Sequence, residues 1–370
     1  MRVAPGMLIS SMVGVVLMCV SGAAFANVFE IKGVPVDVTA ETATKARESA
    51  LARGQDEAFR RLLERLTLVE DRERLPELGG EDVTTFVSDF SVLGEKTSAV
   101  RYLAKLNVRF KPAPIRQLLR SMGVRFAETQ SKPILVLPIY QTARGSALWE
   151  DSNDWRNAWN LRRASEGLVE LALPLGDLAD ISAVNVEQAV RGDVERLTGL
   201  AVRYNAGDTI VAFARLGLEA GAVQRRVDVS VTRFSAHREP ETDFIAMPQL
   251  ADESQEALLV RAADEVARRL EENWKRENLL THDGQGISAV TVPITGLKDW
   301  LDVKRRLAKV SVIRQLEIVL LSLDEVRINL HYVGAPEQLQ TALGQVDLAL
   351  VREDQEWVLY PAGGLPPGKS

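Results

Sequence analysis

Apolar and polar positions follow two different periods in the first third of the chain. Residues 34–39 and 100–110 alternate apolar and polar side chains, which is typical of strands with one buried face. Between them, residues 41–67 place apolar side chains at helical spacing. A further strand over 86–94 and a short proline-initiated helix complete the series. The pattern predicts a β-α-β-β-α domain over residues 27–127, with helices on one face of a small sheet.

Three positions refine this N-terminal domain. The apolar parity changes at Gly33, which predicts a β-bulge there. Pro35 lacks a backbone donor, so its strand is expected at a sheet edge. Gly54 lies on the same helical stripe as alanines, which predicts close contact between the helix and the sheet.

The middle of the chain predicts a three-layer α/β domain over residues 132–280. Residues 134–137 are apolar at every position, as in a strand buried on both faces. Residues 209–216 and 223–234 read as a hairpin, and a long amphipathic helix over 249–278 closes the unit. Alternating strands and helices favour layers of helix on both sides of a sheet. The other predicted elements are a strand over 168–173 and a helix that starts at Asn185, capped with Gln188, with helical segments to about Tyr204.

The last unit, residues 286–361, follows a linker and predicts a ferredoxin-like βαββαβ module. The Gly/Pro-rich tail 362–370 is expected to be loose. The predicted strands are 288–295, 310–320, 325–333, 347–351 and 357–360, and the predicted helices are 297–307 and 336–343.

The first 26 residues have the layout of a secretory signal peptide. Met1-Arg2 is positively charged, an apolar run follows, and Ala24-Phe25-Ala26 gives a cleavage pattern. Cleavage after Ala26 predicts export and a periplasmic location. Lipidation of Cys19 and retention of the leader as an anchor are the alternatives. The bulky Val16-Leu17-Met18 opposes lipidation, and the short, interrupted apolar run opposes an anchor.

Composition excludes several classes of function. A net charge of −6 with mixed signs gives no footprint for nucleic acid. The single cysteine lies in the leader, and His237, His282 and His331 are scattered, so a structural zinc site is not expected. Nucleotide-binding and hydrolase motifs are absent from the sequence. We therefore expect no cofactor, no metal and no catalytic residues, although a Ser-His-Asp triad with members far apart in sequence stays open.

The most unusual local feature is the segment Trp149–Trp159, which holds three of the six tryptophans. It follows a buried strand, and ligands favour the carboxyl ends of α/β strands. One hypothesis is a ligand or partner platform made by Trp149, Asp151, Asp154, Trp155 and Trp159. The alternative is that the tryptophans pin an inserted loop onto the domain, since burial is the usual role of tryptophan.

Several segments resemble the secreted, uncharacterised family called domain of unknown function 2066. The resemblance covers most of the chain after the leader, and it implies no known chemistry. Its segments are Gly33–Ala40, Ala58–Thr67, Pro133–Pro138, Trp149–Trp159 and Tyr332–Leu339. More weakly, residues 134–139 and 208–234 are similar to the α/β domain of the TolB amino-terminal and curli-secretion lipoprotein group. That similarity implies protein–protein contact in the cell envelope.

Three hypotheses on function follow. The leading one is a non-enzymatic periplasmic adaptor or accessory in cell-envelope assembly, with an envelope protein as partner. The second is a soluble binding protein for a glycan, peptide or small ligand at Trp149–Trp159. The third is a hydrolase with an unrecognised site. The adaptor hypothesis predicts an exposed apolar patch on one domain.

Overall fold

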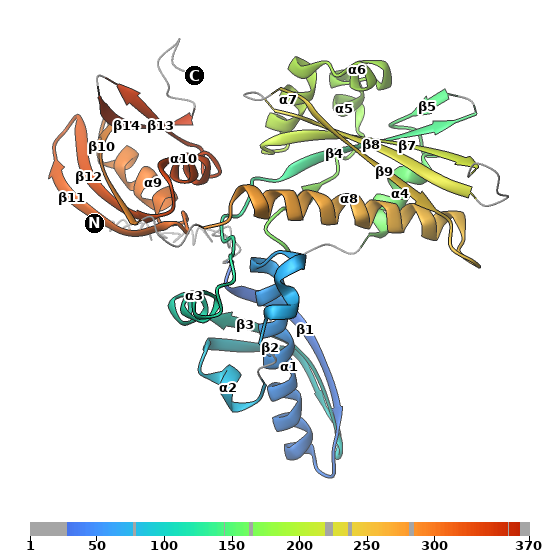
Figure 1. Cartoon of the computed structure of the whole chain (residues 1–370), viewed down its shortest axis with the longest axis horizontal. Helices are drawn as coiled ribbons and strands as arrows, with labels where there is room; N and C mark the ends of the chain where they lie inside the picture. The colour runs from blue at the N-terminus through green and yellow to red at the C-terminus, as the bar shows by residue number, and fades with distance from the viewer. Residues whose placement is uncertain are drawn as a thin grey trace, which may run out of the picture.

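The protein consists of three domains that each combine helices with a sheet (Figure 1). The computed structural model describes residues 28–362, apart from 77–78, 144, 163–165, 219–224, 236–238, 281–284 and 354. The predicted signal peptide and nearly all of the predicted loose tail lie outside the described residues, as do His237 and His282. No helix in the described part of the chain is both long and apolar enough to span a membrane.

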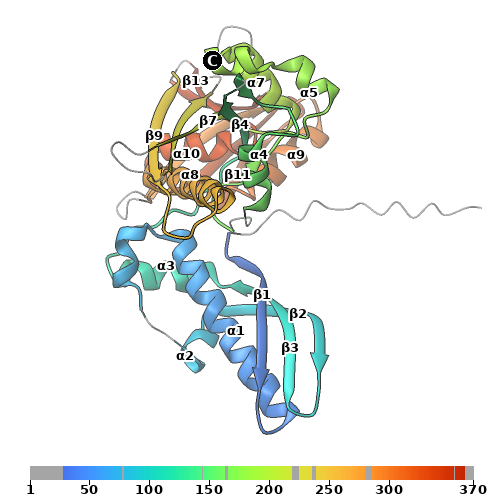
Figure 2. The ribbon, with the colours of Figure 1, turned by 90° about the vertical axis from the view of Figure 1, so that its right-hand side faces the viewer.

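The N-terminal domain has the predicted β-α-β-β-α order. Its three-stranded antiparallel sheet has the order β1-β3-β2, and α1 runs along one face (Figure 2). Its elements are β1 (Glu30–Thr39), α1 (Ala43–Leu66), the 3-10 helix η1 (Val69–Arg74), α2 (Glu81–Thr84), β2 (Val87–Thr97), β3 (Arg101–Phe110) and α3 (Pro112–Ser121).

The three refinements of this domain are confirmed. The β1–β3 register shifts between Ile31 and Val34, where Gly33 has a φ of +66°. Pro35 lies in β1, which is an edge strand. A Cβ on Gly54 would lie 2.3 Å from Leu106 Cδ1, so the small residue lets α1 contact the sheet closely.

The middle domain is the predicted three-layer arrangement. Its sheet has the order β5-β4-β7-β8-β9, with β6 beside β4, and only the β4 pairs with β6 and β7 are parallel. One core packs α4 and α8 on one face, and a second core packs α6 and α7 on the other. The strands are β4 (Ile134–Thr142), β5 (Gly145–Ala147), β6 (Leu171–Ala172), β7 (Asp208–Leu218), β8 (Arg225–Phe234) and β9 (Glu241–Pro248). The helices are α4 (Asp154–Leu161), α5 (Leu178–Ala183), α6 (Val186–Arg191), α7 (Val194–Arg203) and α8 (Gln255–Glu277).

The C-terminal domain has the βαββαβ order extended by one strand. Its sheet order is β11-β12-β10-β14-β13, so β14 rather than β13 lies beside β10, and it runs parallel to β10. β13 pairs antiparallel with β14 and lies at the edge of the sheet. The elements are β10 (Gln285–Pro293), α9 (Leu297–Leu307), β11 (Ile313–Leu321), β12 (Glu325–Val333), α10 (Pro336–Gly344), β13 (Leu348–Glu353) and β14 (Glu356–Pro361).

Candidate functional site

Two of the tryptophans proposed as a ligand platform are core residues. Asn153 caps α4 by accepting a hydrogen bond from the Arg156 amide, and the helix turns Trp155 and Trp159 onto one face. Trp155 is 0% exposed and donates from Nε1 to the Ala212 carbonyl at 2.9 Å. The Trp159 ring packs edge-on against it, with centroids 5.7 Å apart. Both rings therefore stabilise the middle domain and offer no open face to a ligand.

The other three platform residues lie closer to solvent. Trp149 is half-buried and donates from Nε1 to the Val184 carbonyl at 2.8 Å. Asp151 and Asp154 are exposed, and Asp154 accepts a hydrogen bond from Gln255 at 3.3 Å. Contact of this segment with a ligand or partner stays a prediction, and it would have to use these three side chains.

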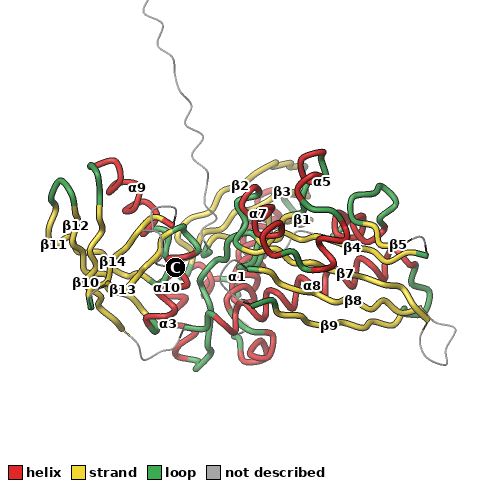
Figure 3. The backbone as a smooth tube through the Cα atoms, turned by 90° about the horizontal axis from the view of Figure 1, so that it is seen from above, coloured by secondary structure: helices red, strands yellow, loops and turns green. Residues whose placement is uncertain are grey.

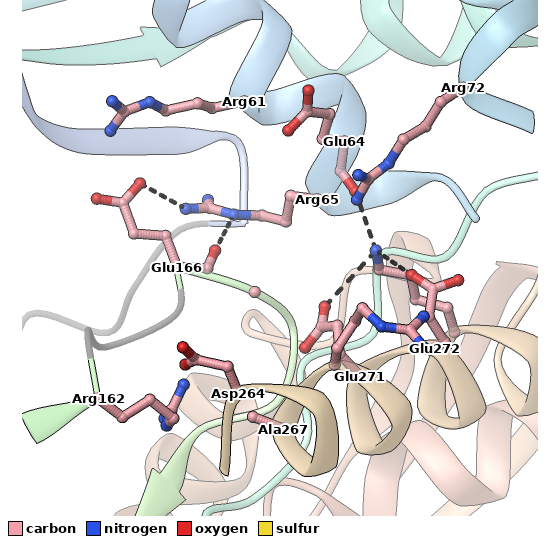
Figure 4. A pocket seen from close by; sticks show the side chains of 13 residues that line it. Arg61, Glu64, Arg65, Arg72, Arg162, Glu166, Asp264, Ala267, Glu271 and Glu272 are labelled. Carbon is pink, nitrogen blue, oxygen red and sulfur yellow. Dashed lines mark hydrogen bonds and ion pairs between the residues drawn. The ribbon is translucent and has the colours of Figure 1, made fainter. Parts of the chain in front are cut away.

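A cleft lined by charged side chains lies between α1 and α8, where the N-terminal and middle domains meet (Figure 4). Its volume is about 450 Å³. Basic and acidic side chains alternate around it, so the cleft has no strong net sign. The charged lining residues are Arg61, Glu64, Arg65, Arg72, Arg162, Glu166, Asp264, Arg268, Glu271, Glu272 and Lys275.

Lys275 joins the two domains at one end of this cleft. Its side chain is 2% exposed and donates from Nζ to the carbonyls of Glu64 and Thr67, at 2.9 and 3.0 Å. Glu272 lies 3.3 Å from the ammonium and also accepts from the Val69 amide at 3.1 Å. The carbonyl groups at the end of α1 have no partner within the helix, and the ammonium group of Lys275 from α8 supplies their hydrogen bonds.

Arg65 makes a second link across the cleft, and Glu271 holds a segment of the middle domain beside it. Glu271 accepts from the amides of Leu168 and Val169 at 2.8 and 2.9 Å, which fixes the segment that leads into β6. Burial raises the pKa of the Glu271 carboxyl, against the effect of these amides and of nearby Lys275. Arg65 donates to the carbonyls of Val28, Glu30 and Glu166, and burial lowers its pKa.

Glu128 connects the N-terminal and C-terminal domains. Its side chain is 0% exposed and accepts from Arg116 of α3 at 2.7 Å and from Arg314 of β11 at 2.9 Å. Its backbone carbonyl accepts from Ser311 at 2.9 Å. A buried carboxylate with two arginines keeps its charge compensated. We call the four charged residues Glu128, Glu271, Glu272 and Lys275 the domain junction.

The chemistry of the domain junction is structural. Each of its four charged side chains is held by backbone groups or opposite charges, which leaves no free acid–base pair at a substrate position. Among the described residues, no cluster of His, Cys, Asp and Glu could hold a metal ion. His331 stands apart on β12, with Nε2 3.7 Å from Glu317.

Exposed apolar side chains gather at one border of the C-terminal domain. Leu321 and Leu323 are 54% and 91% exposed at the end of edge strand β11. On the neighbouring helix α9, Leu297 and Leu301 are 61% and 51% exposed. We call this surface the β11 border, which comprises Leu297, Leu301, Ile318, Val319, Leu320, Leu321 and Leu323.

A smaller apolar surface lies on the helices of the middle domain. Leu178 of α5 is 83% exposed and Val202 of α7 is 77% exposed. Asp177 and Arg203, their neighbours in sequence, form an ion pair at 2.9 Å that holds the two helices together. This surface is the middle apolar face, defined by Leu175, Leu178 and Val202.

The domain junction was not predicted from the sequence. Glu271 lies on the amphipathic helix α8, and its side chain is 13% exposed. A signal was present: Leu259, Ala263, Ala267, Glu271 and Lys275 recur every four residues, so two charges continue an apolar stripe. Their partners on α1 are distant in sequence and no local pattern reveals them.

Comparisons with known proteins do not assign the chain to a family. No family model matches it, and no curated protein matches it. Among solved structures, it is similar to the PelC L103M dodecamer from Paraburkholderia phytofirmans, at 10% sequence identity and a TM-score of 0.22. That match covers 39% of this chain and 90% of the other.

Proposed function

We propose that this protein is a non-enzymatic adaptor or accessory of a cell-envelope assembly, exported to the periplasm and acting through protein–protein contacts. The observation that carries the proposal is the β11 border. Seven large apolar side chains there are exposed along β11, the turn after it and helix α9. Grouped apolar surface of this kind marks interaction sites in soluble proteins.

The domain junction supports the same proposal. Buried ion pairs and backbone hydrogen bonds tie α8 to α1, and Glu128 ties α3 to β11. Three domains fixed in this way present their outer surfaces at set distances from one another, which suits a part that holds partners in place. The predicted leader and the weak resemblance of residues 134–139 and 208–234 to TolB-type and curli-secretion domains favour an envelope location.

Crosslinking of tagged protein in intact cells tests the proposal. We expect a reproducible envelope protein to be captured by the native chain. Capture should fall with Leu321→Lys or with Leu178→Lys, which place a charge on the β11 border and the middle apolar face respectively. Lys96→Glu in the exposed face of the N-terminal sheet is the matched control. A chain that captures no protein and is freely released from the periplasm as a monomer contradicts the adaptor function.

A further inference from the structure

The outer side of β11 has no strand partner among the described residues. Within that part of the chain, β11 pairs with β12 and lies at the edge of the sheet (Figure 3). Edge strands in soluble proteins are commonly guarded by charged side chains or covered by other elements. Four consecutive residues of β11, from Ile318 to Leu321, are instead apolar and 44–60% exposed. An exposed apolar edge is the surface to which an extended peptide adds as a further strand.

Helix α9 packs on one face of the sheet, beside the edge strand β11. Its buried residues Trp300, Val303 and Leu307 face the sheet. On one flank, Arg306 donates to the Asp347 carbonyl at 3.2 Å, so that flank points toward β13 at the opposite sheet edge. Helical geometry places Leu297, Leu301 and Lys304 on the other flank, toward β11. Ile318 and Leu321 face the same side of the sheet as α9, because they pair with the buried Ile328 and Val326. These residues form an apolar surface between α9 and β11.

The charge of this surface changes along the length of β11. Leu297 lies at the start of α9, near the turn that ends β11, because the Ile294 amide donates to the Asp324 carbonyl at 2.8 Å. Lys304 lies in the last turn of α9, near the start of β11, whereas Arg305 forms an ion pair with Asp302 at 3.0 Å. Lys304 is exposed and has no carboxylate partner in the part of the chain that is described. The surface between α9 and β11 is therefore apolar at one end and carries the positive charge of Lys304 at the other.

We propose that this surface binds an extended segment of a protein partner, which adds antiparallel to β11 and carries acidic groups at its C-terminal end. Antiparallel addition continues the β11-β12-β10 pattern and places the C-terminal end of the segment beside Lys304. Alternate apolar side chains of the segment then cover Ile318 and Leu321. The bulge between Ile318 and Leu320 confines regular pairing to a short stretch, which suits a peptide better than a long strand. The proposal rests on the adaptor function and specifies what one of its surfaces binds.

A fluorescence-anisotropy titration of the purified chain tests the proposal. The probe is a labelled eight-residue peptide with valine at alternate positions and two aspartates at its C-terminal end. We expect saturable binding that Leu321→Lys weakens at least tenfold and that Lys304→Glu weakens about threefold, the scale of one exposed ion pair. Leu178→Lys and Lys96→Glu should bind the probe like the native chain. A probe with the aspartates at its N-terminal end should bind several-fold more weakly.

Three results overturn the proposal. One is equal binding of the two probes, and another is binding that Leu321→Lys leaves unchanged. The third is concentration-dependent dimerisation of the chain that Leu321→Lys abolishes, which would show that a second copy covers the edge. Failure here is separate from failure of the adaptor function: partners captured in cells by the Leu321→Lys chain would leave the adaptor standing with a different contact surface.

Discussion

Lys275 and Leu321 occupy environments opposite to those their side chains favour. Lys275 is 2% exposed within the domain junction, where carbonyls and carboxylates surround its ammonium. Leu321 is 54% exposed on the β11 border, where no described element covers it. Burying a charge is costly unless it is paired, and exposing a leucine forgoes hydrophobic stabilisation. The domain junction therefore fixes the orientation of the domains relative to one another. The β11 border, in contrast, is available for contact with a partner.

The largest loss of stability is expected when Trp155 in the core of the middle domain is replaced. Trp155→Ala removes a fully buried ring and its hydrogen bond to Ala212, so we expect a loss of about 4 kcal/mol in the free energy of unfolding. Denaturant titration followed by circular dichroism measures it. Trp149→Ala, at a half-buried position, should cost less. A stable, folded Trp155→Ala chain would argue that the ring is not part of the core.

Removal of the buried Lys275 ammonium should cause the second-largest loss in the free energy of unfolding. Lys275→Ala leaves Glu272 and two carbonyls of the α1 end without their partner, and we expect a loss of about 3 kcal/mol. The measurement is denaturant unfolding together with the radius of gyration from small-angle scattering, which should increase as the domains separate. Lys45→Ala, which breaks an exposed pair with Glu41, is the control and should change neither quantity. An unchanged radius would show that the junction does not fix the domains.

The pH dependence of the junction should follow Glu271. Its pKa in the folded protein is raised above the ordinary 4.5 by burial, so the folded state favours the protonated carboxyl. The stabilisation from protonation is fully present below the unfolded pKa and is lost as the pH rises through the folded pKa. Relative to Glu271→Gln, the native protein should therefore lose stability from pH 4.5 toward neutrality. Unfolding titrations of both chains over that range measure the difference, and parallel curves would contradict it.

The smallest effect on stability is expected at the β11 border. Leu321→Lys changes an exposed side chain, so the free energy of unfolding should shift by less than about 0.5 kcal/mol. The same change is expected to reduce partner capture in cells and to weaken peptide binding at least tenfold. Thermal unfolding of the purified variant checks the first part. A large destabilisation would mean that Leu321 belongs to the core, and the contrast with Lys275 would fail.

Local pattern was sufficient for most of the fold. Alternation and helical stripes predicted the N-terminal domain, and the switch of parity at Gly33 located its bulge. The parallel placement of β14 beside β10 depends on a turn that no periodicity encodes. Strand β9 was missed because Glu241, Thr242 and Asp243 give its first half no apolar alternation, as expected for an edge strand.

The candidate site was harder to predict than the fold. The clustering of tryptophans predicted a platform that includes Trp155. Trp155 and Trp159 are four residues apart in α4, so both lie on the buried face of that helix. The contacts of Lys275 and Glu128 join residues separated by up to 211 positions, which only the assembled domains bring together. The β11 border could not be predicted, because an apolar run in the sequence is compatible both with a covered strand and with an exposed edge strand.

The most direct test of the central claim is site-specific photo-crosslinking in intact cells, with the photoreactive residue at position 319 on β11. The account predicts a discrete adduct with an envelope protein at position 319, and little adduct with that protein from position 96 on the N-terminal sheet. An adduct only between two copies of this chain, or equal labelling from both positions, would contradict the claim that the β11 border receives a protein partner.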